Sequence, residues 1–362
     1  MRKKKPMFEQ VVKVMESFRE KGLPGYDLIV YKDGELLFRH WNGYSDLENR
    51  IPMNGTERYN IYSCSKPITC VAAMQLWEKG LFSLEDPLSK YIPEFAEMTV
   101  QTPEGIKKAE NPILIKHLFE MTAGFSYDCG CPAILRTREE TGGRCPTVQT
   151  IRNLASEPLC FEPGAQWNYS LCHDVLAAVV EVISGVRFGE YVKQNIFDPL
   201  GMKNSTFLLP EEEVEGLAAQ YRFNAELGVP VNCGKQIQTY KLGSEYESGG
   251  AGCISTAEDY IKFLEALRVG DVILKKETIQ LMATDRLDDA QKATYWDQDW
   301  SYGLGLRCPK ENGKTTDFGW GGAAGAFLAV DIPNGLTLYY AQHMLSSPYN
   351  NRLTYESVLE EL

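Results

Sequence analysis

The stretch from Arg58 to Gly80 constrains this 362-residue chain most, because it combines two reactive side chains with a well-defined local pattern. A short β-like run ends near Ile61, and a helical pattern with apolar residues about 3.6 apart follows it. Ser63 and Lys66 stand three residues apart at this junction, so on a helix their side chains share one face. Unpaired N–H groups and the positive dipole end favour negative charge at a helix N-terminus. The stretch therefore predicts a serine beside an amine, at a place suited to an attacked carbonyl.

The Ser-x-x-Lys spacing is weak evidence when it stands alone. A serine at a helix N-cap beside a solvated lysine produces the same spacing and carries no chemistry. The net charge of -12 repels phosphate backbones and anionic membrane surfaces, so we predict no nucleic-acid partner. The length suggests two domains, or one large domain with an inserted lobe, and it is ample for a buried core.

No stretch of the sequence approaches the roughly 20 apolar residues of a membrane-spanning helix. The basic N-terminus runs into an amphipathic pattern in which Glu9, Lys13 and Glu16 interrupt the apolar residues, and this is not typical of a signal peptide. We therefore predict a cytoplasmic protein without a membrane partner.

The 10 cysteines fit that prediction, because thiols stay reduced in a reducing compartment. Cys129, Cys131 and Cys145 cluster in one segment, but their spacing matches no common zinc template. Loop thiols without a catalytic role are favoured over a metal site or a disulfide. The sequence thus predicts no metal and no cofactor.

Strand patterns occur near both ends of the chain. A surface helix over residues 7–21 precedes a predicted hairpin, whose strands at 26–31 and 35–41 are joined by a turn at Asp33-Gly34. A terminal helix is predicted over residues 348–362. Three successive antiparallel strands are predicted before it, at Trp300 to Arg307, Asp317 to Ile332 and Leu336 to Met344.

The middle of the chain is helical and rich in loops. Its predicted parts are a short helix at 113–121, an irregular insertion at 126–147, an apolar helix at 174–184 and an acidic, irregular stretch at 211–247. We therefore predict an α+β fold with an antiparallel sheet flanked by N- and C-terminal helices. Residues 1–84 and 245–362 would form this sheet domain, and residues 85–244 an inserted, mainly helical lobe. A cleft between them is the expected active-site position.

Tyr169 lies on a predicted loop just before the helix that begins near Asp174, so its phenol can project into a cleft. A core or rim tyrosine would give the same pattern. His173 and Asp174 suggest a Ser-His-Asp triad, but we predict that Asp174 caps the helix instead.

The sequence resembles the serine β-lactamase and penicillin-binding-protein superfamily, and within it the class C β-lactamases and β-lactamase-like esterases most of all. The resemblance runs from about Tyr26 to His343, and it implies a β-lactamase/transpeptidase-like fold. One such motif would be weak, whereas the full set in family order is specific. The motifs are Ser63-Cys64-Ser65-Lys66, LFEMTAGF (118–125), PGAQWNYS (163–170), IFDPLGM (196–202), SGGAGCISTAEDY (248–260), YGLGL (302–306) and GWGGAAG (319–325).

The resemblance also implies a role for each matching residue. Ser63 would be the nucleophile, Lys66 its proton acceptor and Tyr169 the second acid/base group. The backbone N–H groups of Ser63 and Ala323 would form the oxyanion hole. The residues implied to wall the substrate cleft are Trp320, Gly321, Gly322 and Ala323.

Two departures from the family pattern bear on the substrate. Leu171 stands two residues after Tyr169, where most members have Asn. Trp320-Gly321-Gly322 stands where many β-lactamases and peptidases have Lys-Thr-Gly, so this motif offers no cation to a substrate carboxylate. Both changes argue against an acidic β-lactam or a peptide C-terminus and favour a neutral ester.

A serine hydroxyl needs an adjacent base, and an exposed lysine is charged at neutral pH. The mechanism therefore requires Lys66 to be buried at the base of a cleft, where it can share a proton with Tyr169. We predict a serine hydrolase that forms an acyl-enzyme with a small-molecule acyl substrate, most simply an esterase on small neutral esters. A β-lactamase, a D-amino-acid peptidase or a transacylase is the alternative. A non-catalytic ligand-binding module is a remote one.

Overall fold

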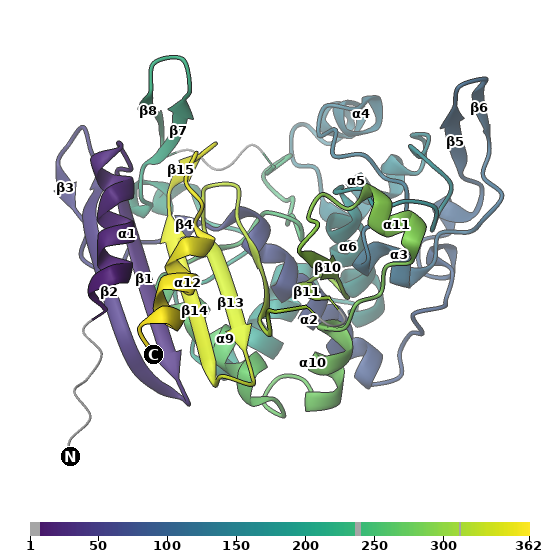
Figure 1. Ribbon diagram of the computed structural model, residues 1–362. Helices are drawn as coiled ribbons and strands as arrows, with labels where there is room; N and C mark the ends of the chain where they lie inside the picture. Colours follow the sequence, from purple (N-terminus) through teal and green to yellow (C-terminus); the bar gives the residue numbers. More distant parts are fainter. Residues whose placement is uncertain (1–7, 236–239, 311–312) are drawn as a thin grey trace.

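One antiparallel sheet joins the two ends of the chain. The computed structural model describes residues 8–235, 240–310 and 313–362 (Figure 1). Within these residues, the sheet has the strand order β10-β11-β12-β13-β14-β1-β2-β3. Strand β1 pairs with β14, so the first strand of the chain lies beside the last strand of the sheet. The strands are β1 (Gly25–Lys32), β2 (Glu35–Asp46), β3 (Ile51–Pro52), β10 (Trp300–Tyr302), β11 (Arg307–Pro309), β12 (Phe318–Gly321), β13 (Phe327–Asp331) and β14 (Leu336–Gln342).

Helices cover both faces of this sheet. Helices α1 (Glu9–Glu20) and α12 (Arg352–Glu360) lie side by side on one face, and α9 (Ala257–Val269) packs on the other (Figure 1). Alternation along β14 serves both layers, because Tyr340 joins the core under α1 while Tyr339 stacks on Tyr260 of α9 at 4.4 Å between ring centroids. The predicted terminal helices and hairpin are thus confirmed, although residues 1–7 lie outside the described part of the chain.

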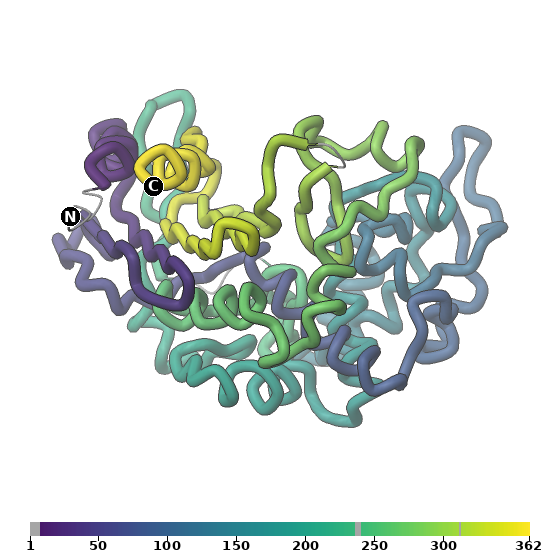
Figure 2. Tube along the Cα trace, turned by 60° about the horizontal axis from the view of Figure 1, so that its bottom comes forward, coloured from purple at the N-terminus to yellow at the C-terminus, as the bar shows by residue number. Residues whose placement is uncertain are grey.

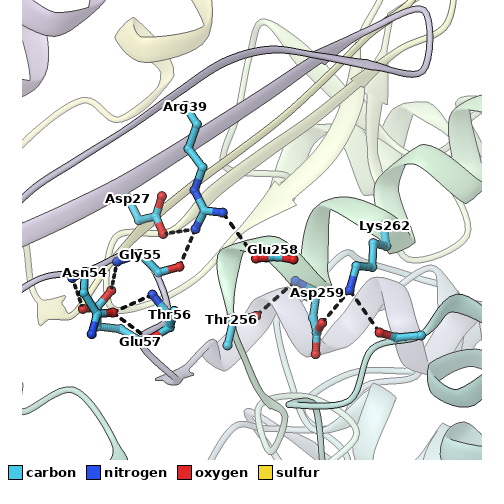
Figure 3. Close-up of polar contacts among 11 residues, drawn as sticks. Asp27, Arg39, Asn54, Gly55, Thr56, Glu57, Thr256, Glu258, Asp259 and Lys262 are labelled. Atoms are coloured by element: carbon cyan, nitrogen blue, oxygen red, sulfur yellow. Dashed lines mark hydrogen bonds and ion pairs between the residues drawn. The ribbon is translucent and has the colours of Figure 1, made fainter.

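A charged network fixes α9 to the first two strands (Figure 3). Arg39 of β2 donates to Asp27 Oδ2 of β1 at 3.0 Å, and its other terminal nitrogen lies 3.5 Å from Glu258 of α9. The Thr256 hydroxyl caps α9 by accepting from the Asp259 N–H at 3.0 Å. Burial raises the pKa of Asp27 to about 6, although the Arg39 charge opposes this rise.

Two central helices pack against each other beside the sheet. Helix α2 (Ser65–Glu78) is buried along its first three turns and contacts α6 (Cys172–Ser184). Figure 2 shows both chain termini at the left of the molecule and blue segments of the inserted part of the chain at the right. The remaining helices are α3 (Ile115–Phe119), α4 (Pro132–Glu140), α5 (Thr147–Leu154), α7 (Phe188–Val192), α8 (Asp198–Leu200), α10 (Lys276–Met282) and α11 (Asp289–Thr294).

The boundaries predicted for the sheet domain (1–84 and 245–362) and the inserted lobe (85–244) stay a prediction. The α+β class with an antiparallel sheet is confirmed. Among the described helices, none has the length and apolar character needed to cross a membrane.

The structure corrects four predicted segments, two in the middle of the chain and two near its C-terminus. The insertion at 126–147 contains α4, and the acidic stretch at 211–247 contains a hairpin whose first strand pairs with β15 (Met344–Leu345). That hairpin, β7 (Gln220–Asn224) and β8 (Val229–Gly234), is largely exposed, so it lacks the apolar alternation that signals a strand. Residues 236–239 of that stretch lie outside the described part of the chain.

The other two corrections concern the C-terminal strands. The segment predicted as one strand from Trp300 to Arg307 is two strands, β10 and β11, paired with each other. Gly305 has a φ of +81°, and the Gly303 N–H bonds to the Leu306 carbonyl, so the glycines form a turn where a continuous strand was expected. The segment from Asp317 to Ile332 likewise divides into β12 and β13.

Candidate active site

Ser63 lies on a tightly held turn. It is the middle residue of a 3₁₀ turn, Tyr62–Cys64, that leads directly into α2. Tyr62 has a φ of 47°, a left-handed conformation that costs energy for a bulky residue and is found at functional sites. Neighbouring bonds hold this turn in place: the Tyr62 hydroxyl donates to Gln220 at 3.1 Å, and the Ser65 hydroxyl donates to the Tyr62 carbonyl at 2.6 Å. The surrounding structure therefore fixes the position of the Ser63 side chain.

The structure brings Ser63, Lys66 and Tyr169 together. The Tyr169 hydroxyl lies 2.5 Å from Ser63 Oγ, and Lys66 Nζ lies 3.4 Å from the same oxygen. Lys66 is completely buried, and its amine donates to the Gly250 carbonyl at 2.7 Å. Lys66 Nζ also stands 4.4 Å from the centroid of the Tyr169 ring. A hydroxyl, a phenol and a buried amine thus share one hydrogen-bonded cluster, as the sequence predicted.

Tyr127 is a member of this cluster that the sequence reasoning missed. Its hydroxyl lies 3.3 Å from Lys66 Nζ, and its ring stacks on Tyr169 with 5.3 Å between centroids. Burial, with a smaller contribution from Tyr169, raises the pKa of Tyr127 well above its ordinary value. Tyr127 follows the LFEMTAGF motif by two residues, and that proximity was the available signal.

Leu171 leaves a gap in the family pattern that Tyr127 fills. Leu171 is buried in the apolar core, so no amide from this position reaches Lys66. The amine finds its acceptor in the Tyr127 hydroxyl instead. The loop before α4 thus supplies a contact to Lys66 that Leu171 does not make.

Asp174 does not cap its helix, contrary to the prediction. Helix α6 begins at Cys172, two residues earlier than predicted, so Asp174 falls inside the first turn and is buried. Its Oδ1 accepts from the Tyr246 hydroxyl at 2.9 Å. His173 contacts Cys70 Sγ at 3.5 Å and the Phe119 carbonyl at 3.3 Å, which rules out the Ser-His-Asp arrangement in this structure.

The end of β12 lies against the serine turn. A Cβ on Gly322 would stand 2.6 Å from the Ile61 carbonyl, so only glycine permits this close approach. Ala323 follows at the exposed start of the turn into β13. Among the described residues, neither the Ser63 N–H nor the Ala323 N–H donates to a protein acceptor. Both amides are thus free to bind an oxyanion, as a developing negative charge requires.

Ser63 opens into a cavity of about 360 Å³ with largely aromatic walls. Trp320 stacks on Tyr169 at 5.9 Å, and Trp296, which is 57% exposed, packs on Tyr169 at 4.9 Å. The residues that line the cavity are Ser63, Tyr169, Tyr295, Trp296, Asp297, Arg307, Trp320, Gly321, Gly322, Ala323 and Phe327. All four residues predicted for the cleft wall therefore line it.

The cation in this cavity already has a partner. Arg307 is buried and donates to Asp317 at 2.7 Å, and its guanidinium stacks on Trp300 at 4.0 Å. Asp297, which is partly buried, adds a carboxylate to the wall. Arg352 Nη2 shares the Asp317 carboxylate at 3.2 Å, and Arg307 Nη1 has no hydrogen-bond partner among the described residues, so Asp317 neutralises the Arg307 charge only in part.

The cysteine cluster forms neither a disulfide nor a metal site in this structure. Cys129, Cys131 and Cys145 are free thiols. Within residues 8–235, 240–310 and 313–362, no three His, Cys, Asp or Glu side chains are grouped as a metal site requires.

Comparison with known proteins places this geometry in a family. The chain belongs to the Beta-lactamase family, whose sequence model matches residues 8–356. It is 28% identical over 348 residues to the protein named Esterase EstB of Burkholderia gladioli, and the alignment covers 89% of this chain and 86% of that protein. It is 26% identical over 353 residues to the serine beta-lactamase-like protein LACTB of Homo sapiens, covering 79% of this chain and 62% of that protein.

Solved structures show the same fold. The simvastatin synthase LovD of Aspergillus terreus aligns with a TM-score of 0.81 at 21% identity, covering 99% of this chain and 98% of that one. EstCE1, described as a hydrolase with promiscuous acyltransferase activity, aligns with a TM-score of 0.80 at 24% identity, covering 98% and 97%. The predicted superfamily and the β-lactamase/transpeptidase-like fold are confirmed, and the protein is a serine hydrolase of this family.

Proposed function

We propose that this protein hydrolyses small neutral esters through an acyl-enzyme formed on Ser63. The observation that carries the proposal is the position of Ser63 Oγ, 2.5 Å from the Tyr169 hydroxyl and 3.4 Å from Lys66 Nζ, at the wall of an aromatic cavity. A serine becomes a nucleophile when an adjacent group takes its proton, and the Tyr169 oxygen is close enough to do so.

The proposed reaction has two acyl-transfer steps. In the reactive form Tyr169 is deprotonated; Ser63 Oγ bonds to the ester carbonyl carbon while the Ser63 proton passes to the Tyr169 phenolate oxygen, which lies nearer to Ser63 Oγ than Lys66 Nζ does. The N–H groups of Ser63 and Ala323 bind the oxyanion. Tyr169 then protonates the departing alkoxide as the carbon–oxygen bond breaks. The positive charge of Lys66 stabilises the phenolate form of Tyr169. Water, activated by Tyr169 in the same way, releases the acid from Ser63.

The walls of the cavity support an uncharged, apolar substrate. The aromatic rings of Tyr169, Trp296 and Trp320 offer apolar contact area, and Arg307 already donates to Asp317. The wall has Trp320-Gly321-Gly322 in place of the Lys-Thr-Gly lysine that would receive the carboxylate of a β-lactam or a D-amino-acid peptide. A neutral small-molecule acyl substrate is therefore the proposed ligand, and the free thiols support a cytoplasmic location as part of the same proposal.

Acyl transfer is a second candidate, because a relative carries that name. The ML-236A carboxylate methylbutanoyltransferase mlcH of Penicillium citrinum is 28% identical over 256 residues, which cover 66% of this chain. Butanol added to a 4-nitrophenyl butyrate assay separates the two activities. Butyl ester formed faster than butyric acid, at millimolar alcohol in water, would favour the transferase.

The test of the proposal is direct. Ser63→Ala should abolish turnover of 4-nitrophenyl butyrate and labelling by a fluorophosphonate. Cys160→Ala is the matched control, because it removes an exposed nucleophile elsewhere on the molecule and should leave both signals intact. Nitrocefin and a D-alanyl peptide, assayed beside the ester, test the β-lactamase and peptidase alternatives. Full ester turnover by Ser63→Ala would refute the proposal.

A further inference from the structure

The amine of Lys66 is arranged as a charged group. An ammonium carries three N–H donors and no acceptor. Lys66 Nζ has three hydrogen-bonding oxygens around it: the Gly250 carbonyl at 2.7 Å, the Tyr127 hydroxyl at 3.3 Å and Ser63 Oγ at 3.4 Å. A completely buried cation is costly unless an anion lies near it. This geometry therefore raises the question of which group supplies the opposite charge.

The Asp174 carboxylate and the Lys66 amine both lie close to Gly250. A Cβ on Gly250 would lie 2.5 Å from Asp174 Oδ2 and 3.4 Å from Lys66 Nζ. The carboxylate is thus within about 6 Å of the amine, a range over which an opposite charge stabilises a charged group. Any side chain at residue 250 would collide with the carboxylate, so glycine is what permits the approach.

Other titratable side chains packed around this pair are uncharged at neutral pH, apart from the proton-exchanging Tyr169. Burial raises the pKa of Tyr127, Tyr246 and Cys70 well above their usual values. It also raises the pKa of Cys172 to about 11 and of Cys129 to about 12, and it lowers the pKa of His173 to about 3. Asp128, next to Cys129, is exposed and screened by solvent. Burial also raises the pKa of Asp174, and the Ser248 hydroxyl, the Lys66 charge and the Tyr246 hydroxyl oppose this rise. Lys66 and Asp174 are therefore the two groups of this buried cluster whose opposite charges can pair.

We infer that Asp174 is the counter-ion of Lys66, a positioning residue that acts across Gly250 to keep the amine protonated. The inference rests on the proposed function and specifies which residue of the site is deprotonated. In the reactive form of the cluster, the Asp174 charge keeps Lys66 protonated, so Tyr169 is the residue that has lost its proton. The Ser63 proton then moves to the Tyr169 oxygen as Oγ bonds to carbon, while Lys66 keeps its three protons throughout.

The pH dependence of kcat/KM tests this inference. Asp174→Asn removes the charge but keeps an acceptor for Tyr246. We expect both limbs of the profile for 4-nitrophenyl butyrate to move to lower pH by about one to two units, because a lost anion disfavours every protonated neighbour. Tyr246→Phe is the matched control, since it removes the 2.9 Å hydrogen bond and leaves the charge, so both limbs should stay in place. A lower kcat/KM in Asp174→Asn, with both limbs of the pH profile at their wild-type pH, would overturn the inference.

A second measurement does not depend on activity. Lys66→Met leaves Asp174 buried without its partner, so at pH 8 we expect a lower urea midpoint of unfolding. Adding Asp174→Asn should restore part of that loss, whereas midpoint losses that simply add would overturn the counter-ion role. Absence of ester turnover in the wild-type protein would contradict the proposed function instead, and the unfolding midpoints would still decide the pairing.

Discussion

Replacing Tyr127 with Phe isolates one hydrogen bond at the reactive cluster. The substitution keeps the ring that stacks on Tyr169 at 5.3 Å and removes only the hydroxyl that lies 3.3 Å from Lys66 Nζ. One N–H of a completely buried amine would then have no partner. A hydrogen bond to a charged group contributes about 1.5–3 kcal/mol, and the length of this one favours the lower end. We therefore expect kcat to fall about tenfold.

The assay is steady-state hydrolysis of 4-nitrophenyl butyrate, with kcat and KM measured separately at pH 8. KM should change little, because Tyr127 is not among the residues that line the cavity. Tyr240→Phe is the matched control, since Tyr240 packs edge-on against Tyr127 at 5.3 Å and makes no hydrogen bond to Lys66 within the described part of the chain. Wild-type kcat in a folded Tyr127→Phe protein would refute the reasoning.

Three further variants test other parts of the structure. Gly322→Ala would place a Cβ 2.6 Å from the Ile61 carbonyl, so the turn that carries the Ala323 N–H should shift and kcat should fall about 100-fold. An unchanged kcat would contradict this expectation. Burial lowers the pKa of His117 to about 4, so its share of the unfolding free energy, about 3 kcal/mol, should be lost as the pH falls from 6.5 towards 4. In urea titrations, His117→Gln should remove that loss. Burial raises the pKa of Asp27 to about 6, so protonation of Asp27 stabilises the folded protein as the pH falls below 6. Asp27→Asn should therefore make the free energy of unfolding fall more steeply with decreasing pH. For either variant, a dependence of this free energy on pH that parallels the wild-type curve would contradict the expectation.

The sequence predicted those parts of the fold that depend on local patterns. The Asp33-Gly34 turn specified the first hairpin, and the run after Ser63 specified a helix that the structure buries along its first three turns. The motif order predicted the family, the fold and the gathering of Ser63, Lys66 and Tyr169 in one cluster. These features are encoded within a few residues, or in a set of motifs whose order is itself specific.

The parts that were missed depend on contacts between distant segments. Tyr127 lies in a loop without regular pattern, and only the packing of that loop on α2 brings its hydroxyl to Lys66. Asp174 has the residue type of a helix cap, but burial beside Gly250 gives it a different surrounding. The exposed hairpin β7–β8 carries no apolar alternation because little of it faces the core. Local propensity does not contain this tertiary information.

The most direct measurement is intact-mass analysis of the protein quenched with acid during turnover of 4-nitrophenyl butyrate. We expect one butyryl group per chain, located by peptide mapping on the segment that contains Ser63, and no such adduct in Ser63→Ala. Ester turnover without an adduct, or with the acyl group on another residue such as the exposed Cys160, would contradict it.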